Sequence, residues 1–240
     1  MTQHQIGSRE QWIAASQTLL KAEKAWTHER DRLAEQRRAL PWVRVEKDYV
    51  FQGPEGPVSL SDLFDGRDQL IVYHFMFGPD WNEGCPGCSF LADHVDGARQ
   101  HFEHRDISFV AISRGPIDKI MAYRQRMGWS FPWVSSLGND FNFDYHVSFD
   151  GEHEGPEPTY NFEPRTGGEA GEAPGVSVFF RDDDGTIYHT YSSYGRGGEV
   201  LIGAYNFIDM APLGRNEGDA IMGDWMRRHD RYEDDGRRKT

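Results

Sequence analysis

The length, composition and charge of the chain exclude several classes of protein. Its 240 residues favour one domain with additions, and 15 Phe, 10 Tyr and 7 Trp within a hydrophobic fraction of 38% supply enough apolar surface for a core, which argues against disorder. The formal net charge of -13 argues against binding to nucleic acid or to an anionic membrane, since phosphates attract clustered cations.

Hydropathy gives no sign of a membrane or export segment. No run approaches the roughly 18 apolar residues of a membrane span, and residues 1–5 are polar, unlike the apolar core of a signal peptide. We therefore expect a cytoplasmic protein.

The first predicted element is a long amphipathic helix within residues 1–40, an extension of the domain. Ser8 is placed to cap it together with Gln11, and Pro41 ends it. Its apolar residues recur at spacings of three, four and seven: Trp12, Ala15, Leu19, Ala22, Trp26, Leu33 and Ala39. We expect this face to pack on the domain or to join two copies of the chain as a homodimer.

Residues 41–215 carry the pattern of an α/β domain. In chain order the pattern predicts strands at 42–51, 58–60 and 70–77, a helix at 86–102, a strand at 107–113, a helix at 116–127 and a strand at 133–136. Residues 70–77 are apolar at both odd and even positions, as in a central strand that is covered on both faces. The alternation of strand and helix that follows predicts parallel strands joined by crossover helices.

Residues 138–175 are a long acidic insertion within this domain. The first part, 141–149, alternates apolar and polar side chains, so we expect an extra strand or a docked flap that packs on the domain or across a dimer near the cysteines. The second part, 151–174, is rich in Gly and acidic residues, and we expect a mobile flap that limits which disulfides reach the site.

A hairpin and two helices complete the chain. Strands at 176–180 and 187–191 flank an Asp-Asp-Asp-Gly turn, which is a strong hairpin signal. A helix is predicted at 199–210, and residues 216–240 are expected to form a C-terminal helix at 219–229 and a charged tail.

The chain has only two cysteines, Cys85 and Cys88, placed between the central strand and the helix predicted at 86–102. Two cysteines do not make a disulfide framework, so they indicate chemistry. At a helix N-terminus, unpaired N–H groups and the helix dipole stabilise a thiolate, which makes Cys85 the expected nucleophile. Cys88 lies one turn later, where it can resolve a mixed disulfide by closing a bond to Cys85.

This order of elements, with Cys-x-x-Cys opening the first crossover helix, resembles the thioredoxin superfamily. The likeness is carried by Val58-Ser59-Leu60-Ser61-Asp62-Leu63, Tyr73-His74-Phe75-Met76-Phe77-Gly78-Pro79-Asp80-Trp81, Gly84-Cys85-Pro86-Gly87-Cys88 and Gly175-Val176-Ser177-Val178-Phe179-Phe180. These strings are similar to a bacterial thioredoxin-like family of unknown function, whose members are often labelled predicted dithiol-disulfide oxidoreductases and are related to peroxiredoxin and thiol reductase domains.

Over about residues 40–230 the resemblance implies a thioredoxin-like α/β fold, with a central mixed sheet flanked by helices. It also implies a thiol-disulfide oxidoreductase that needs no cofactor. Its partners would be a disulfide or thiol substrate, either a protein or a small molecule, and an external thiol as electron donor. Pro86-Gly87 stands where thioredoxins have Gly-Pro, so the direction of exchange stays open.

The resemblance suggests a candidate base in the central strand. Laying residues 71–75 on the thioredoxin pattern puts His74 at the position of a buried acid that accepts a proton. A neutral histidine could serve as a base there. The alternative is a core histidine that is hydrogen-bonded to the backbone.

Three residues are candidates for binding substrate. Most of these families have a cis-proline that leaves a backbone edge for an extended substrate; Pro174 is near that place, and counting back from the hairpin turn puts the equivalent nearer Val176. Pro174 could also be an ordinary loop proline. Trp81, four residues before Cys85, could shield the disulfide, form a platform for substrate or simply pack.

Two alternative functions stay open. A peroxiredoxin-like peroxidase would require a Pro seven residues before the reactive cysteine and a hydroxyl residue near it; here Pro79 comes six residues before Cys85, and Glu83 takes the hydroxyl position. A non-catalytic binding or assembly module would use the cysteines structurally or for a metal. Zinc wants four ligands, and the candidates His94, His101 and His104 match no zinc signature, so we predict no metal site.

Overall fold

The computed structural model describes residues 5–153, 158–165, 170–217 and 225–232. The chain divides into two units, Met1–Pro41 and Trp42–Thr240. The first unit is the helix α1 (Arg9–Arg38), and the predicted cap is confirmed: the Ser8 hydroxyl accepts from the Gln11 N–H at 3.3 Å, while the Gln11 side chain accepts from the Ser8 N–H at 2.8 Å. Within the described part of the chain, no helix is both long and apolar enough to cross a membrane.

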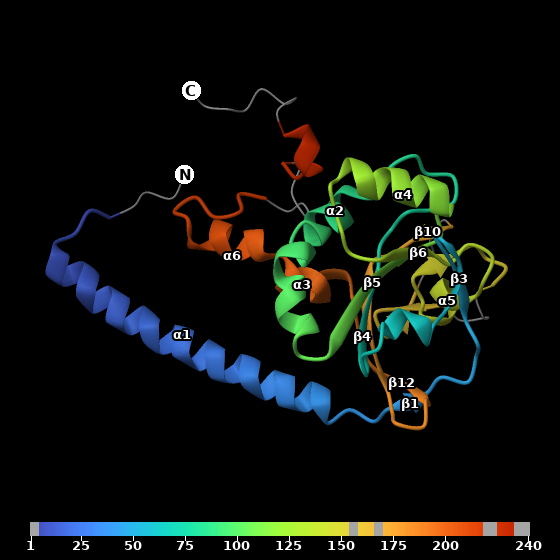
Figure 1. The fold of residues 1–240 in the computed structure, drawn as a ribbon. Coiled ribbons are helices and arrows are strands. Elements are labelled where there is room, and N and C mark those ends of the chain that lie inside the picture. The colour runs from blue at the N-terminus through green and yellow to red at the C-terminus, as the bar shows by residue number, and fades with distance from the viewer. Residues whose placement is uncertain (1–4, 154–157, 166–169, 218–224, 233–240) are drawn as a thin grey trace. The chain divides into compact units, whose positions relative to one another are not determined.

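The second unit is built on a mixed sheet (Figure 1). Its strands lie in the order β1 (Val43–Arg44), β12 (Ile187–Tyr194), β11 (Gly175–Arg181), β4 (Gln69–His74), β5 (Ile107–Ser113), β6 (Trp133–Ser135), β2 (Val50–Gly53) and β3 (Gly56–Ser59). Strand β5 is parallel to β4 and to β6, and the other neighbours are antiparallel. Two small ladders pair β7 (Ser148–Phe149) with β10 (Gly171–Glu172), and β8 (Thr159–Tyr160) with β9 (Glu163–Pro164).

Helices connect these strands and cover the sheet. They are α2 (Pro86–Ala92), α3 (Val95–Glu103), α4 (Ile117–Arg126), α5 (Phe141–Asp144) and α6 (Gly203–Met210), with 3-10 turns η1 (Asp62–Phe64), η2 (Gly195–Leu201) and η3 (His229–Arg231). The run β4-α2-α3-β5-α4-β6 gives parallel strands joined by crossovers, and the β11-β12 hairpin lies antiparallel against β4. The predicted thioredoxin-like α/β fold is confirmed.

The side chains of β4 alternate between two hydrophobic clusters, one on each face of the sheet. Tyr73 faces the cluster that contains Cys88 and side chains of α2, α3 and α4. Leu70 and Val72 face the other cluster, which contains Phe141 of α5. Successive side chains of a strand point to opposite faces of the sheet, so only every second residue of β4, Tyr73 among them, lies on the same face as the cysteines.

The segment 42–51, expected as one strand, forms two. Strand β1 pairs with β12 at one edge of the sheet, and β2 pairs with β3 at the other. Tyr49 lies just before β2 and is buried against Phe51 and Phe141. The chain therefore crosses one face of the sheet between the two short strands.

The helix expected at 86–102 is broken at Asp93 and His94 into α2 and α3. Asp93 accepts a hydrogen bond from the Trp129 indole at 2.8 Å, and Nε2 of His94 accepts from the N–H of Ala204 at 2.9 Å. Contacts from distant segments hold these two side chains and end α2 early.

The insertion differs in part from the prediction. Residues 141–149 form α5 and β7 instead of an extra strand of the main sheet. Phe141 and Tyr145 are buried in the domain as expected, but they lie in the cluster on the face of the sheet opposite to Cys88 and not near the cysteines. In the described part of 151–174, β8 pairs with β9 and β10 pairs with β7. This part is therefore hydrogen-bonded to itself and to the domain, where a mobile flap was expected.

The last elements also differ in extent. The predicted hairpin is confirmed, with strands longer than expected, and residues 199–210 form η2 and α6 rather than one helix. Of the helix expected at 219–229, residues 219–224 lie outside the described residues, and residues 225–228 are not helical.

Candidate active site

The loop between β4 and α2 carries Cys85 to the start of the helix. The Cys85 N–H donates to the carbonyl of Met76 at 3.0 Å, and Pro86 begins α2, where its missing N–H costs nothing. A Cβ on Gly84 would lie 2.6 Å from the Phe75 ring and 2.7 Å from the ring of Tyr123. Only glycine allows the loop to pass this close to the core and still present Cys85.

The two thiols are free and stand in different environments. Cys85 is partly exposed, whereas Cys88 is buried. A hydrogen bond with Cys88 is the largest cause that lowers the pKa of Cys85 to about 6; burial opposes it, and the N–H groups of Cys88 and Gly87 and the charge of Arg228 add to it. At neutral pH Cys85 is therefore mainly a thiolate.

Cys88 has the opposite character. Burial raises the pKa of its thiol well above the ordinary value, and the nearby Cys85 sulfur adds to this effect. The hydroxyl of Tyr73 hydrogen-bonds the Cys88 sulfur, and the N–H of Met76 donates to it at 3.4 Å. Both donors favour the anion of Cys88, but burial outweighs them. The pair thus combines one partly exposed thiolate with one buried thiol.

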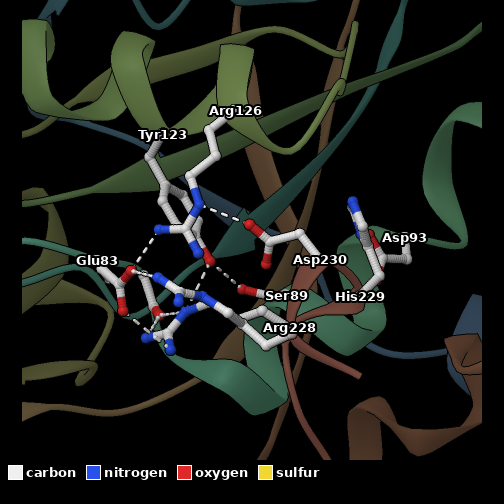
Figure 2. A network of polar contacts seen from close by, with 10 residues as sticks. Glu83, Ser89, Asp93, Tyr123, Arg126, Arg228, His229 and Asp230 are labelled. Carbon is white, nitrogen blue, oxygen red and sulfur yellow. Dashed lines mark hydrogen bonds and ion pairs between the residues drawn. The ribbon is translucent and has the colours of Figure 1, made fainter. Parts of the chain in front are cut away.

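A C-terminal residue holds the loop in place (Figure 2). Arg228 donates to the carbonyl of Gly84 through Nε at 3.0 Å and Nη2 at 2.6 Å, and to the Tyr123 hydroxyl at 3.0 Å. The same tyrosine pairs with Ser89 at 2.8 Å, and Ser89 donates to the Cys85 carbonyl at 2.8 Å. A continuous set of hydrogen bonds therefore runs from Arg228 to the backbone on both sides of the reactive thiol.

Glu83 links the same loop to further cations. Its carboxylate contacts Arg228 at 3.1 Å, Arg231 at 3.4 Å and also Arg126 (Figure 2). A hydrogen bond from Arg126 is the largest cause that lowers the pKa of Glu83, with the charges of all three arginines acting in the same direction. Arg126 also binds Asp230 at 2.7 Å, so the segment 225–232 is tied to both the loop and α4.

A cavity of about 280 Å³ opens beside the two thiols. Its lining comes from β4, α2, the insertion, the start of β11 and η2: Tyr73, Met76, Cys85, Gly87, Cys88, Leu91, Tyr160, Pro174, Gly175, Val176, Ser193, Gly195, Arg196, Gly198, Glu199 and Ile202. The structure thus brings Pro174 and Val176 together with the cysteines. The peptide bond before Pro174 is trans.

Trp81 and His74 lie elsewhere. Trp81 packs against the cluster that contains Cys88 and against Gly78, but it does not line the cavity. His74 projects from the face of β4 opposite to Tyr73 and packs against Phe141. The structure does not bring the histidine to the thiols.

His74 belongs to a buried chain of hydrogen bonds across three strands. Its Nε2 pairs with the Ser177 hydroxyl at 2.8 Å, Ser177 pairs with Ser192 at 2.8 Å, and Ser192 pairs with His189 at 2.7 Å. Burial lowers the pKa of His74 to about 3, and it also lowers the pKa of His189. Both histidines are neutral at pH 7 and hold β4, β11 and β12 together. His74 therefore fits the alternative reading of a hydrogen-bonded core histidine, although its partner is the hydroxyl of Ser177 and not the backbone.

The residues considered for zinc do not assemble around the cysteines. Searched across the described ranges, no group of three or more His, Cys, Asp or Glu side chains could hold a metal ion. His94 is engaged through both ring nitrogens, by the Phe90 carbonyl at 2.8 Å and the Ala204 N–H.

Comparison with known proteins places the chain in a family. Residues 1–232 match the model of the family described as "Bacterial protein of unknown function (DUF899)". The chain belongs to this family. The family resemblance noted in the sequence is thereby confirmed. No curated protein matches the chain.

Several peroxiredoxins are among the solved structures that are similar to this chain. The peroxidoxin BcpB from Mycobacterium tuberculosis is 15% identical and has a TM-score of 0.47, with 70% of this chain and 97% of that chain covered. The mitochondrial 2-cys peroxiredoxin from Plasmodium falciparum is 15% identical, with a TM-score of 0.41 and coverages of 69% and 92%. Peroxiredoxin Q from Xanthomonas campestris is 14% identical, with a TM-score of 0.42 and coverages of 63% and 86%. Each likeness concerns the fold alone.

Sequence reasoning missed three residues of the site. Tyr73 could have been found, because strict alternation along β4 puts it on the face opposite to His74 and the helix after Cys85 must cover one face. Arg228 and Tyr160 carry no such signal, since they reach the site from segments far along the chain.

Proposed function

We propose that the chain is a dithiol-disulfide oxidoreductase that works through Cys85 and Cys88. The observation that supports it best is the asymmetry of the pair: the thiol that lines the cavity and is partly exposed has a lowered pKa, and the thiol one turn later is buried and has a raised pKa. A nucleophile must be anionic and reachable, whereas a resolving thiol must stay protonated until the mixed disulfide has formed.

The proposed exchange proceeds in two balanced steps. The Cys85 thiolate attacks one sulfur of a disulfide, forms a mixed disulfide and releases the other half as a thiolate. Cys88 then gives up its proton, which neutralises the released thiolate, and its sulfur attacks Cys85; the second half leaves and the Cys85–Cys88 bond closes. The substrate gains two electrons and the protein loses two, which an external thiol returns by the reverse reaction.

The residue at position 83 does not support peroxide reduction. The peroxiredoxin pattern described above has a hydroxyl residue at this position, and here it is Glu83. The carboxylate at this position is held ionised by Arg126, Arg228 and Arg231, so it accepts hydrogen bonds and does not donate them.

A trapping experiment tests the proposal. The reduced Cys88→Ser variant should attack a small disulfide and remain as a mixed disulfide, seen as a mass increase of one half of the reagent, whereas Cys85→Ser should trap none. Reduced wild-type protein should instead close its internal bond and lose two hydrogens. A wild-type chain that no disulfide oxidises, or a Cys85→Ser variant that traps as readily as Cys88→Ser, would contradict the proposal.

Two further assays separate the alternatives. Oxidation of the reduced protein by hydrogen peroxide that outpaces every disulfide would favour a peroxidase. Alkylation of both cysteines that is slow at neutral pH and accelerates on addition of a chelator would favour a metal-bound module.

A further inference from the structure

The cavity beside the thiols is small and largely apolar. Its volume of about 280 Å³ lies near the lower end of the range for sites that bind small molecules. Apolar parts of Met76, Leu91, Val176 and Ile202 form much of the wall. A ligand that reaches Cys85 through this cavity must lose most of its hydration.

The charged residues at the cavity neutralise each other. Apart from the Cys85 thiolate, the charged residues among the described lining residues are Arg196 and Glu199, which are joined by two hydrogen bonds of 2.7 and 3.1 Å, and Glu199 also contacts Arg215 at 3.3 Å. An ionic ligand would therefore lose water without gaining an unpaired partner, which is costly in an apolar cavity. The wall favours an uncharged ligand.

The insertion occupies the backbone next to the cavity. The Tyr160 hydroxyl donates to the Pro174 carbonyl at 2.8 Å and accepts from the N–H of Gly195 at 2.9 Å, while the N–H of Ala173 donates to the Val147 carbonyl at 2.8 Å. An extended polypeptide would need such main-chain groups to add itself beside a strand. Here residues of the insertion already use them.

Tyr160 is also fixed by its ring. It packs edge-on against Phe149 and Tyr194, with ring centroids 6.2 and 5.6 Å apart. Two hydrogen bonds at the hydroxyl and two ring contacts therefore hold Tyr160 beside the start of β11.

We propose that the cavity takes a small, uncharged, largely apolar disulfide or thiol, and that Tyr160 bars extended polypeptides from Cys85. This inference rests on the proposed dithiol-disulfide exchange and names the substrate class of that reaction. The bonds formed and broken are those given above, with the small disulfide reduced to two thiols and the Cys85–Cys88 bond formed.

Matched disulfides test the inference. Dipropyl disulfide and 3,3′-dithiodipropionate share one carbon-sulfur skeleton and differ by two carboxylates, and insulin supplies a polypeptide disulfide. Oxidation of the reduced wild-type chain is followed by mass spectrometry, and each rate is divided by the rate of the same disulfide with free dithiothreitol. We expect dipropyl disulfide to be preferred at least tenfold over both others.

Substitutions then locate the barrier. Tyr160→Ala should raise the relative rate with insulin at least tenfold, and Tyr160→Phe, which removes only the hydroxyl, should raise it several-fold. Phe162→Ala is the matched control, because Phe162 belongs to the same insertion, is 76% exposed and does not line the cavity, and its rates should equal those of the wild type.

The outcomes separate this inference from the proposed function. Equal relative rates for all three disulfides, or Tyr160 variants that behave like Phe162→Ala, would overturn the substrate class and leave the exchange reaction in place. Failure of every disulfide to oxidise the wild-type chain would overturn both.

Discussion

Arg228 donates two hydrogen bonds to the carbonyl oxygen of Gly84, at 3.0 and 2.6 Å, across a separation of 144 residues. Gly84 directly precedes Cys85, so the C-terminal segment places a full positive charge beside the loop that carries the reactive thiol. That charge is one of the causes that lower the pKa of Cys85. A residue remote in sequence thus both positions the loop and favours the thiolate.

Replacing Arg228 should weaken the thiolate. In Arg228→Gln the pKa of Cys85 should rise above about 6, because a cation is lost while burial still disfavours the anion. Alkylation of Cys85 by iodoacetamide at pH 6 should slow by roughly threefold to tenfold, and its midpoint in a pH titration should move upward.

Two variants separate the charge of Arg228 from its other effects. Arg228→Lys keeps the charge but loses the fork of two donors, so it should fall between wild type and Arg228→Gln. Arg231→Gln removes a neighbouring cation that also contacts Glu83, and it should leave the midpoint unchanged. An equal shift in Arg231→Gln would assign the effect to the net charge of the segment instead.

Tyr73 should control the second step. Its hydroxyl favours the anion of Cys88, so in Tyr73→Phe the pKa of Cys88 should rise further and resolution of the mixed disulfide should slow. Loss of one hydrogen bond worth about 1 kcal/mol corresponds to roughly a fivefold slower step. Rapid mixing with acid quench and mass spectrometry should show a longer-lived mixed disulfide. His74→Phe is the control on the opposite face; if it slowed this step equally, the histidine would regain its expected role as a base.

The contrast between Tyr73 and His74 shows what the sequence could give. Apolar residues at both odd and even positions predicted a central strand at 70–77, and the structure has β4 at Gln69–His74. The helix expected to follow Cys85 does begin at Pro86. Which face of β4 is covered by α2 depends, however, on the handedness of the chain connection. The thioredoxin pattern pointed to His74, whereas the residue of β4 that contacts the thiols is Tyr73, on the opposite face.

Other parts of the site depend on contacts that no local pattern records. The break at Asp93 needs Trp129, and the position of the cysteine loop needs Arg228. The insertion looked mobile because it is rich in Gly and acidic residues, yet Tyr160 finds two main-chain partners once the fold has formed. Such side chains gain their roles only from the tertiary structure, so propensity and spacing do not reveal them.

His74 should make the fold sensitive to acid. Its pKa is lowered from 6.5 to about 3 by burial, so between these values the unfolded chain binds a proton that the native chain does not. Stability is therefore full above pH 6.5 and is lost as the pH falls toward 3, by up to about 1.4 kcal/mol per pH unit for this group. Urea unfolding of His74→Phe should show a shallower loss of stability over this range, and a slope equal to that of the wild type would contradict the prediction.

The last prediction concerns α1 and the homodimer expected from its sequence. Trp12, Leu19, Trp26 and Leu33 recur every seven residues on this 30-residue helix, and their side chains are 58%, 60%, 62% and 42% exposed. A stripe of this period is buried when two helices pair. We therefore expect the full chain to sediment as a dimer, and Trp12→Glu with Leu19→Glu and Trp26→Glu to sediment as a monomer. The matched control, Gln17→Glu with Lys24→Glu, makes the same change of three negative charges on the opposite face and should stay dimeric. A wild-type monomer at all concentrations, or a triple variant that remains dimeric, would show that the stripe serves another contact.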